Sequence, residues 1–286
     1  MMSAGGTEST RVIFRRLLRV EPELGTPARG GLPATTARLH GEGWSLTGRK
    51  IFSTGAEGLR WMAVWARTDE TPARVGSFLV RADAPGIGVE RTWDHLGLRA
   101  SRSDDVIFTG TPVAPGATTG LAEPAPGASA PATFLAWNAL GLTALYLGVA
   151  DAARDWLAGF LAERTPAALG RPLATLPRFQ AAVGEIEAAL AAAGDLVDAL
   201  AQRVDAGQPD AIARAGIAKL TGTRAAIGAV EQAVALVGNN GLTRRNPLER
   251  HYRDVLCARV HTPQDDPILA AAGRSALQAA APHLTF

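Results

Sequence analysis

Residues Gly238–Asp266 read Gly-Asn-Asn-Gly-Leu-Thr-Arg-Arg-Asn-Pro-Leu-Glu-Arg-His-Tyr-Arg-Asp-Val-Leu-Cys-Ala-Arg-Val-His-Thr-Pro-Gln-Asp-Asp. The run from Gly238 to Gly241 predicts the end of a helix, because Gly and Asn tolerate the positive φ of a helix C-cap. The arginines that follow predict either a solvated, ion-paired helix face or contacts to the phosphates of a ligand: Arg244, Arg245, Arg250 and Arg253.

Upstream of this stretch the apolar residues recur with a helical period. They step mostly by threes and fours through Leu173–Val204 and again through Ile212–Val237, as expected for amphipathic helices. The short connection Asp205–Pro209 implies that these helices are antiparallel neighbours. The C-terminal half is therefore predicted to be a helical bundle.

The N-terminal half has a different pattern, in which short β-branched and aromatic runs alternate with Gly and Pro turns. The predicted strands are Trp44–Leu46, Lys50–Ser53, Trp61–Ala66, Gly76–Val80, Gly88–Thr92 and Asp105–Phe108. Such even spacing is typical of an antiparallel barrel or sandwich, and Pro115–Pro131, rich in Ala, Pro and Gly, predicts a linker. We therefore expect an α+β protein, with an antiparallel β-barrel or sandwich domain followed by an antiparallel domain that resembles a four-helix bundle.

Composition narrows the class of protein. With 286 residues, 47% hydrophobic and 20% charged, the chain is expected to be folded and soluble. A net charge of +2 is compatible with a phosphate-bearing ligand but gives no argument for nucleic acid. The single cysteine, Cys257, excludes an internal disulfide, fits a cytoplasmic protein and predicts a packed thiol.

Ala132–Ala150 carries no charge, yet its Thr, Asn and Gly residues favour a buried bundle helix over a membrane span.

The turn at Gly238–Gly241 and the following helix, which ends in Arg253-Asp254, resemble the end of the acyl-CoA dehydrogenase family. Two more strings occur in the family's order: Glu21–Thr26 is similar to Thr-Glu-Pro-x-x-Gly-Ser, and Gly48–Ala56 to Gly-x-Lys-x-Trp-Ile-Thr-Asn-Gly. The resemblance implies a flavoprotein oxidoreductase that binds FAD, acts on the CH–CH group of an acyl-CoA or other small molecule, and forms a homodimer or homotetramer.

The resemblance also implies the flavin-binding residues of the β domain. Thr26 matches a hydroxyl that lies against the flavin, whereas Val20 lacks the hydroxyl of its counterpart. Phe52 would pack on the isoalloxazine ring, and Thr54 would supply a donor near the reactive edge. In a third similar segment, His95–Ser101, we expect Arg99 to pair with a local carboxylate.

In the helical half, the resemblance covers Glu163–Leu173, where the family has an arginine that reaches the FAD pyrophosphate of a neighbouring subunit. Arg164 matches this position, and Arg171 is the alternative, because a guanidinium fork suits two phosphates. Gly238 and Gly241 would permit the close approach of the backbone to the dinucleotide across a dimer interface.

In many of these enzymes a glutamate, eight residues after the Asp, removes the α-proton of the substrate; here that register falls on Thr262. An alkanol is far too weak a base for this step. Other members carry the glutamate on the first bundle helix, but Phe134–Gly148 holds Asn138 and no carboxylate. The other candidate groups are His261, which titrates near neutrality, and Asp265.

Asp265 and Asp266 also fit an N-terminal helix charge, for a helix beginning near Pro267. The remaining histidines form no convincing metal set, so we predict no metal site: His40, His95, His251 and His283.

Three functions therefore stay open: a dehydrogenase with FAD, a monooxygenase with FMN or FAD, and a flavin-free subunit that pairs with a complete homologue. In the monooxygenase, Asn138, Thr54 and His261 would form the oxygen site. The expected domains are a short leader (1–19), a β domain (20–121) and a helical bundle (122–286). The leader occupies the place of an all-helical domain that, in the family, forms one wall of the acyl pocket. Either the chain is a fragment, its start is misplaced, or a partner chain supplies this wall.

Overall fold

The computed structural model describes residues 17–20, 32–124 and 131–284. The candidate flavin contact Thr26 and the rest of the Glu21–Thr26 string lie outside the described residues. The chain divides into a β unit, formed by Met1–His95 and Arg99–Ser129, and a helical unit, formed by Leu96–Leu98 and Ala130–Phe286.

The β unit is built on one sheet with the strand order β6-β7-β3-β2-β4-β5-β8, and β1 also pairs with β4. Its strands are β1 (Leu17–Val20), β2 (Thr36–His40), β3 (Gly43–Ser53), β4 (Trp61–Thr68), β5 (Val75–Arg81), β6 (Ile87–Glu90), β7 (Asp104–Val113) and β8 (Thr118–Ala122). The 3-10 helices η1 (Ala56–Gly58) and η2 (Arg99–Ser101) lie between them. Strand β4 alternates strictly between buried and half-buried residues, which is the period-two pattern of a strand with one face on the core.

The α+β class is confirmed, with three corrections within the sheet. First, β4 pairs in parallel with β1 and with β2, so the sheet is mixed where an antiparallel one was predicted. Second, the predicted strands Trp44–Leu46 and Lys50–Ser53 are parts of the single strand β3, because Gly48, with φ +154°, continues the strand. Third, β8 lies within the predicted linker and pairs with β5. Edge strands need only backbone pairing, so its polar residues did not reveal it.

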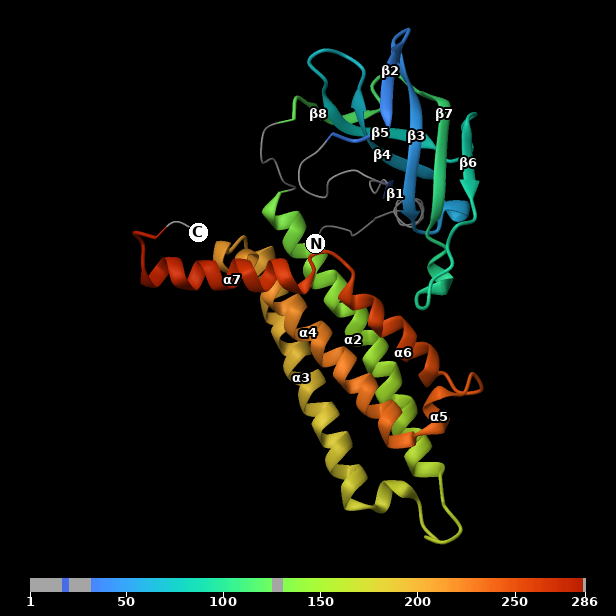
Figure 1. Ribbon diagram of the computed structural model, residues 1–286, viewed down its shortest axis with the longest axis vertical. Coiled ribbons are helices and arrows are strands. Elements are labelled where there is room, and N and C mark those ends of the chain that lie inside the picture. The colour runs from blue at the N-terminus through green and yellow to red at the C-terminus, as the bar shows by residue number, and fades with distance from the viewer. Residues whose placement is uncertain (1–16, 21–31, 125–130, 285–286) are drawn as a thin grey trace, which may run out of the picture. The chain divides into compact units, whose positions relative to one another are not determined.

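The helical unit contains three long helices, α2 (Ala132–Glu163), α3 (Pro177–Asp205) and α4 (Pro209–Val237), which lie side by side in Figure 1. Short connections make successive helices antiparallel, so α2 and α4 run in the same direction. The shorter helices are η3 (Leu173–Thr175), α5 (Asn239–Leu242), α6 (Leu248–Leu256), η4 (Cys257–Arg259) and α7 (Asp265–Ala280). Helix α6 packs on α2 and α4, which completes the predicted bundle of four.

Small residues bring the long helices close together. A Cβ on Gly222 of α4 would lie 2.3 Å from the Cγ2 atom of Thr143 on α2. Helix α2 is long and apolar enough to cross a membrane by length and composition alone, a test that a core helix of a bundle also passes. One side of α2 contributes Leu140, Tyr146 and Leu157 to the helical core, as the sequence predicted for a bundle helix.

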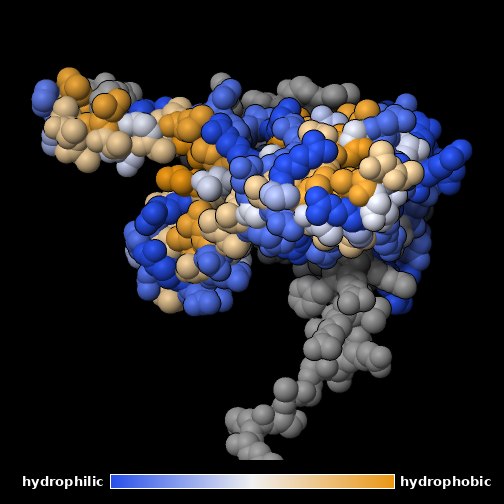
Figure 2. All heavy atoms as spheres, turned by 90° about the horizontal axis from the view of Figure 1, so that it is seen from below, coloured by the Kyte–Doolittle hydropathy of each residue, from blue (hydrophilic) through white to orange (hydrophobic). Residues whose placement is uncertain are grey.

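Other apolar side chains of the helical unit face outwards. Exposed on α2 are Phe134, Leu135, Trp137 and Leu145, and exposed on α7 are Leu269 and Leu277. In Figure 2, helix α7 forms the arm at the upper left, and orange apolar side chains run along it. Apolar residues gathered in this way are typical of surfaces that bind another chain.

Leu96–Leu98 is a short segment that the Arg-Asp pair of α6 holds in the helical unit. The Leu98 amide donates to Oδ1 of Asp254 at 2.7 Å, and Nη1 of Arg253 donates to the Leu96 carbonyl at 2.7 Å. Between these two bonds, Gly97 lies directly against the backbone of Arg253. The family-like Arg-Asp therefore anchors a segment that the chain inserts from the β unit.

Candidate functional site

An exposed aromatic cluster lies at the end of β3 in the β unit. The rings of Trp93 and His95 stack, with centroids 3.7 Å apart and planes inclined by 9°. Phe52 meets both rings edge-on, with its centroid 6.2 Å from that of Trp93 and 6.1 Å from that of His95. The three rings line a shallow hollow. The cluster offers an apolar surface to a planar ring, and Phe52 is one of the residues predicted to do so.

Phe52 itself is held in an unusual conformation. Its φ is +54°, in the left-handed region that non-glycine residues rarely adopt, and its side chain is 51% exposed. The register between β3 and β7 shifts between Lys50 and Ser53, as at the β-bulges that re-aim side chains next to active sites. Such backbone strain costs roughly 1–3 kcal/mol and persists mainly at functional sites. The conformation therefore favours a binding role for Phe52.

Three hydroxyl groups form a chain beside this cluster. The Thr54 Oγ1 and Ser103 Oγ atoms lie 2.9 Å apart, and Ser103 Oγ lies 2.8 Å from Ser101 Oγ. Ser103 is buried, whereas Thr54 is exposed. Three hydroxyls carry three hydrogens, and the two contacts use two of them, so one hydrogen remains for a group outside the chain. Ser103 thus orients the predicted donor Thr54.

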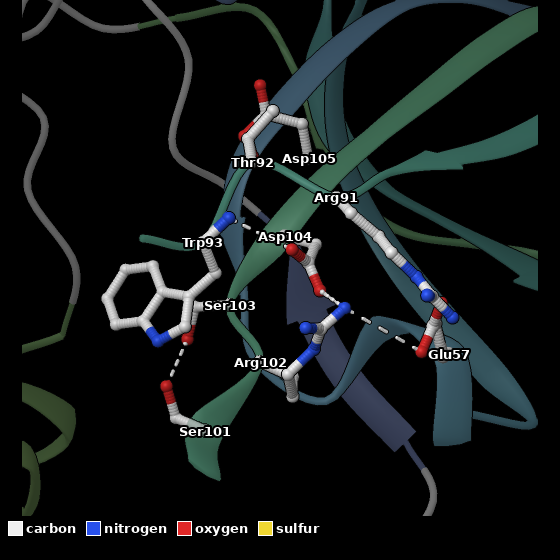
Figure 3. Close-up of polar contacts among 9 residues, drawn as sticks. All are labelled: Glu57, Arg91, Thr92, Trp93, Ser101, Arg102, Ser103, Asp104 and Asp105. Carbon is white, nitrogen blue, oxygen red and sulfur yellow. Dashed lines mark hydrogen bonds and ion pairs between the residues drawn. The ribbon is translucent and has the colours of Figure 1, made fainter. Parts of the chain in front are cut away.

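Two adjacent carboxylates of β7 fix the segment that carries Trp93. Oδ1 of Asp104 accepts from the Trp93 amide at 3.0 Å, and Oδ1 of Asp105 accepts from the Thr92 hydroxyl at 2.9 Å (Figure 3). Oδ2 of Asp104 lies 3.1 Å from Nη2 of Arg102, in an ion pair without hydrogen-bond geometry. Oδ2 of Asp105 accepts from Nε of Arg49 at 2.8 Å. The carboxylates therefore support the aromatic cluster from within the sheet.

Among the described residues, Arg99 forms a hydrogen bond to the backbone and no ion pair with a carboxylate. Its Nε donates to the carbonyl oxygen of His95 at 3.2 Å, where a carboxylate partner was expected. The 3-10 helix that starts at Arg99 turns the side chain back along the chain, so the backbone supplies the acceptor.

In the helical unit, Thr262 stands at the position of the family's base and is held through its backbone carbonyl. Nδ2 of Asn138, on α2, donates to the Thr262 carbonyl at 2.9 Å. The preceding residue, His261, bonds through Nδ1 to the hydroxyl of Tyr146, also on α2, at 2.6 Å. Within the described part of the chain, neither Thr262 nor His261 has a carboxylate as a hydrogen-bond partner. The structure thus brings three of the candidates, Asn138, His261 and Thr262, together, and none of the hydrogen bonds described there involves a carboxylate.

The hydrogen bond of Asp265 is made to Arg224, outside the group formed by Asn138, His261 and Thr262. Asp265 begins α7, two residues before the predicted start near Pro267, and Asp266 follows it in the first turn. Oδ2 of Asp265 accepts from Nε of Arg224 at 3.2 Å, across a hollow that Asp266 and Gln264 also line. This is the predicted placement of an N-terminal helix charge, favourable to the helix dipole.

A buried lysine borders the His261 segment. Lys219 is fully buried on α4, and its Nζ donates to the Ala258 carbonyl at 3.0 Å. Burial lowers the pKa of Lys219, although Asp265 opposes this shift. Burial lowers the pKa of His261 as well, and the charge of Lys219 acts in the same direction. His261 is therefore kept neutral at pH values where an exposed histidine would begin to protonate.

Acidification is expected to destabilise the protein through His251 and His261. Burial lowers the folded-state pKa of both, with Arg250 adding to the effect on His251. As the pH falls through about 6.5, the unfolded chain therefore binds protons first, and the stability present above that pH is lost. Thermal unfolding followed from about pH 7.5 to 5.5 measures the slope. His261→Gln should flatten it; a slope equal to that of the wild-type protein would refute the assignment.

The predicted phosphate-binding residues lie at the other end of the bundle. Arg164 follows the last turn of α2, and Gly238, with φ +56°, ends α4; Figure 1 shows the ends of both helices near α5. Gly241 is buried against Val234. Helices rise about 1.5 Å per residue, so Asn138 lies roughly 39 Å from Arg164 along α2. One flavin cannot reach from its ring at one end to its pyrophosphate at the other.

The arginines near Gly241 divide into two kinds. Arg253 forms a two-bond ion pair with Glu249, as predicted for a paired helix face. Arg244 and Arg245 are exposed, and within the described ranges no ion pair involves their side chains. They are therefore available to phosphate oxygens, which is the other predicted role.

Cys257 is half-buried, and its Sγ donates to the Arg253 carbonyl at 3.8 Å. Burial raises the pKa of this thiol, so it is the packed group that the sequence predicted. In the described ranges, no three His, Cys, Asp or Glu side chains are placed to hold a metal ion.

Sequence reasoning missed the residues that support the candidates: Ser103, Trp93, Asp104, Tyr146 and Lys219. Several of their contacts join distant parts of the sequence, as in the 115 residues that separate Tyr146 from His261. One signal could have found Lys219, since a lysine in the run Ile217-Ala218-Lys219-Leu220 interrupts the apolar period of a core helix. The others carry no local pattern.

Comparison with known proteins supports the same fold and family. The model of the acyl-CoA dehydrogenase middle domain matches residues 20–111, and that of the acyl-CoA dehydrogenase C-terminal domain matches residues 126–262. A putative acyl-CoA dehydrogenase, YdbM, of Bacillus subtilis (strain 168) is 35% identical over 251 residues, which span 87% of this chain and 64% of that protein.

A second relative has a different activity. L-evernosamine nitrososynthase of a Micromonospora species is 34% identical over 272 residues, covering 87% of this chain and 62% of that protein. The solved structure of KijD3 with FMN and dTDP-3-amino-2,3,6-trideoxy-4-keto-3-methyl-D-glucose is 26% identical, with a TM-score of 0.74, and covers 95% of this chain and 70% of that one.

The chain spans less than two thirds of the length of these two curated relatives. The matches run in the family's order from residue 20 to residue 262. The chain therefore belongs to the acyl-CoA dehydrogenase family of flavoproteins, whose middle and C-terminal domains it matches.

Proposed function

We propose that this protein is a flavin-dependent monooxygenase of the acyl-CoA dehydrogenase fold, rather than a dehydrogenase of acyl-CoA thioesters. The observation that carries the proposal is the group at the base position. There, Thr262 is held by Asn138, and its neighbour is a neutral imidazole bonded to a phenol. Dehydrogenation needs a base that reaches the α-carbon. Monooxygenation needs instead hydrogen-bond donors for an oxygen atom that gains negative charge.

The residues of the β unit fit a flavin. The strained, exposed Phe52 and the stacked Trp93 and His95 offer an apolar surface to its ring. The hydroxyl chain at Thr54 has one hydrogen to donate, which suits a ring that becomes negatively charged on reduction. A bound flavin, once reduced, would supply the electrons that molecular oxygen requires. FAD is the family's usual cofactor and FMN the alternative, since FMN occurs in the KijD3 structure.

The helical unit supports an oligomer as the active form. Arg164 and Gly238 lie at one end of the bundle, and Asn138 at the other, roughly 39 Å away. If both ends serve flavin sites, each site draws its phosphate-binding residues and its reactive-end residues from different copies. The exposed apolar residues Leu135 and Trp137 of α2 and Leu269 of α7 would suit the contact between copies. A flavin-loaded monomer in light scattering would contradict this arrangement.

Acyl-CoA dehydrogenation is the second candidate, because the relative at 35% identity is a putative acyl-CoA dehydrogenase. The nitrososynthase relative, at 34% identity, makes an amino sugar the first substrate to test under the monooxygenase proposal. A flavin-free subunit, paired with a complete homologue, would purify without colour.

The purified protein separates these possibilities. We expect a yellow protein whose flavin is not bleached by acyl-CoA thioesters without oxygen, and whose reduced flavin is reoxidised rapidly when oxygen is admitted. Bleaching of the wild-type flavin by any acyl-CoA would overturn the proposal in favour of dehydrogenation. A colourless protein that gains no absorbance on incubation with FAD or FMN would support the flavin-free subunit.

Thr262→Glu is expected to create dehydrogenase activity. The substitution places a carboxylate at the register where the family carries its base, and general-base catalysis contributes about 100- to 10,000-fold. Anaerobic bleaching by a short-chain acyl-CoA, recorded in a stopped-flow spectrophotometer, measures the gain. Thr262→Gln is the matched control, since it has the same size without basicity. If both variants stay unbleached, the register of the base position is wrong.

A further inference from the structure

The hydroxyl of Tyr146 is the starting point. Tyr146 is fully buried on α2, and burial raises its pKa strongly, so the phenol keeps its hydrogen. Its oxygen lies 2.6 Å from Nδ1 of His261, and no other hydrogen bond is recorded for it within the described ranges. A buried hydroxyl hydrogen without an acceptor is costly. The phenol therefore donates to Nδ1.

This direction decides where His261 carries its own hydrogen. A neutral imidazole has one protonated nitrogen and one bare nitrogen. If Nδ1 accepts from Tyr146, Nδ1 is the bare nitrogen and Nε2 is protonated. The opposite tautomer would direct two hydrogens at each other or leave the phenol hydrogen without an acceptor.

The backbone on both sides of His261 is fixed from two different helices. Nζ of Lys219, on α4, holds the Ala258 carbonyl at 3.0 Å, and Nδ2 of Asn138, on α2, holds the Thr262 carbonyl at 2.9 Å. The imidazole lies between these two anchors and is half-buried. It is thus restrained in position as well as in tautomer.

The charged and titratable groups around this pair favour a neutral ring. Lys219 from α4 opposes a positive charge on His261. Asp254 and Cys257 act on Tyr146 from α6 and η4, and Asp265 of α7 acts on Lys219. Each of the helical elements around His261 therefore contributes to the same state, a neutral phenol facing a neutral imidazole.

We propose that Tyr146 is a positioning residue that holds His261 with its hydrogen on Nε2, so that the ring is a hydrogen-bond donor beside the family's base position. Such a ring stabilises an oxygen atom that gains negative charge, and with Nδ1 engaged it has no free lone pair with which to take a proton from a substrate. The role in catalysis rests on the proposed function, whereas the tautomer does not.

Nuclear magnetic resonance of the protein, labelled with nitrogen-15 in its histidines, tests the tautomer directly. We expect a signal from a proton that is bonded directly to Nε2 of His261. The loss of this signal in His261→Gln assigns it to His261. Tyr146→Phe removes the donor and should shift the ring towards the Nδ1-protonated form. Tyr252→Phe, at the only other tyrosine, is the control and should leave the tautomer unchanged. A wild-type proton on Nδ1, or an unchanged tautomer in Tyr146→Phe, would overturn the proposal.

The reaction supplies a second readout. If His261 donates through Nε2, Tyr146→Phe should lower the kcat of the oxygen-dependent reaction about 10-fold or more, with little change in flavin content or KM. Failure of the wild type to react with oxygen would contradict the proposed function and leave the tautomer result standing. Should Tyr146→Phe fail to fold, which circular dichroism would reveal, the wild-type tautomer alone still decides the proposal.

Discussion

Replacing Gly97 with alanine is expected to lower the free energy of unfolding by about 3 kcal/mol. The added Cβ would lie 2.2 Å from the carbonyl oxygen of Arg253, 2.7 Å from its carbonyl carbon and 2.8 Å from Sγ of Cys257. Two of these atoms belong to the backbone of a packed helix, so they cannot rotate away. The Leu96–Leu98 segment must move instead, which lengthens the bonds that Arg253 and Asp254 make to it.

Equilibrium unfolding in denaturant measures this loss. Gly88→Ala is the matched control, because a Cβ there meets nothing within 4 Å, and we expect its effect to stay within about 0.5 kcal/mol. Arg253→Ala and Asp254→Ala should each weaken the same anchor without a steric clash. If Gly97→Ala unfolds at the same denaturant concentration as Gly88→Ala, the anchoring of this segment by α6 is not as described.

Replacing Asp104 with alanine is expected to lower the free energy of unfolding by about 2 kcal/mol and to reduce flavin retention. Asp104 is fully buried, and its carboxylate accepts from the Trp93 amide at 3.0 Å. Hydrogen bonds to charged groups are stronger than neutral ones. Its ion pair with Arg102 adds less, because the Arg102 side chain is 43% exposed. Loss of the carboxylate should therefore release the segment that holds the Trp93–His95 stack.

Flavin absorbance after gel filtration, together with equilibrium unfolding, measures both effects. Asp104→Asn retains an oxygen acceptor for the Trp93 amide and should lose less of each. Asp83→Ala breaks an exposed ion pair with Arg81, and such pairs contribute about 0–1 kcal/mol. An Asp104→Ala protein as stable as Asp83→Ala, with full flavin content, would show that the carboxylate does not support the aromatic cluster.

The α+β class and the order of the two halves followed from periodicity. Apolar steps of three and four in Leu173–Val204 and Ile212–Val237 correspond to α3 and α4. Short β-branched runs gave most of the strands. The parallel pairings of β4 and the strand β8 could not be predicted from periodicity. The direction in which two strands pair depends on partners that are distant in sequence. An edge strand also needs only backbone hydrogen bonds, which any residue provides.

The candidate site was predictable only as single residues. Phe52, Thr54, His261 and Thr262 could be singled out by their place in ordered strings. The residues that support them could not, since Ser103 and Asp104 are joined to the Phe52–Thr54 and Trp93 segments only through sheet pairing and side-chain contacts. Tyr146 resembles any other apolar position of its helix until α2 and the segment after α6 are packed together.

The sequence by itself determined the family, the cofactor class that the family uses, and the absence of a carboxylate at Thr262, because each depends on residue identity in order along the chain. Only the tertiary structure decided which side chains lie beside Thr262. It pairs Tyr146 with His261 at 2.6 Å and ties Thr262 to Asn138. The physical reason is that a hydrogen bond needs two atoms within about 3 Å in a defined direction, and residues more than a hundred positions apart meet this condition only after the helices have packed.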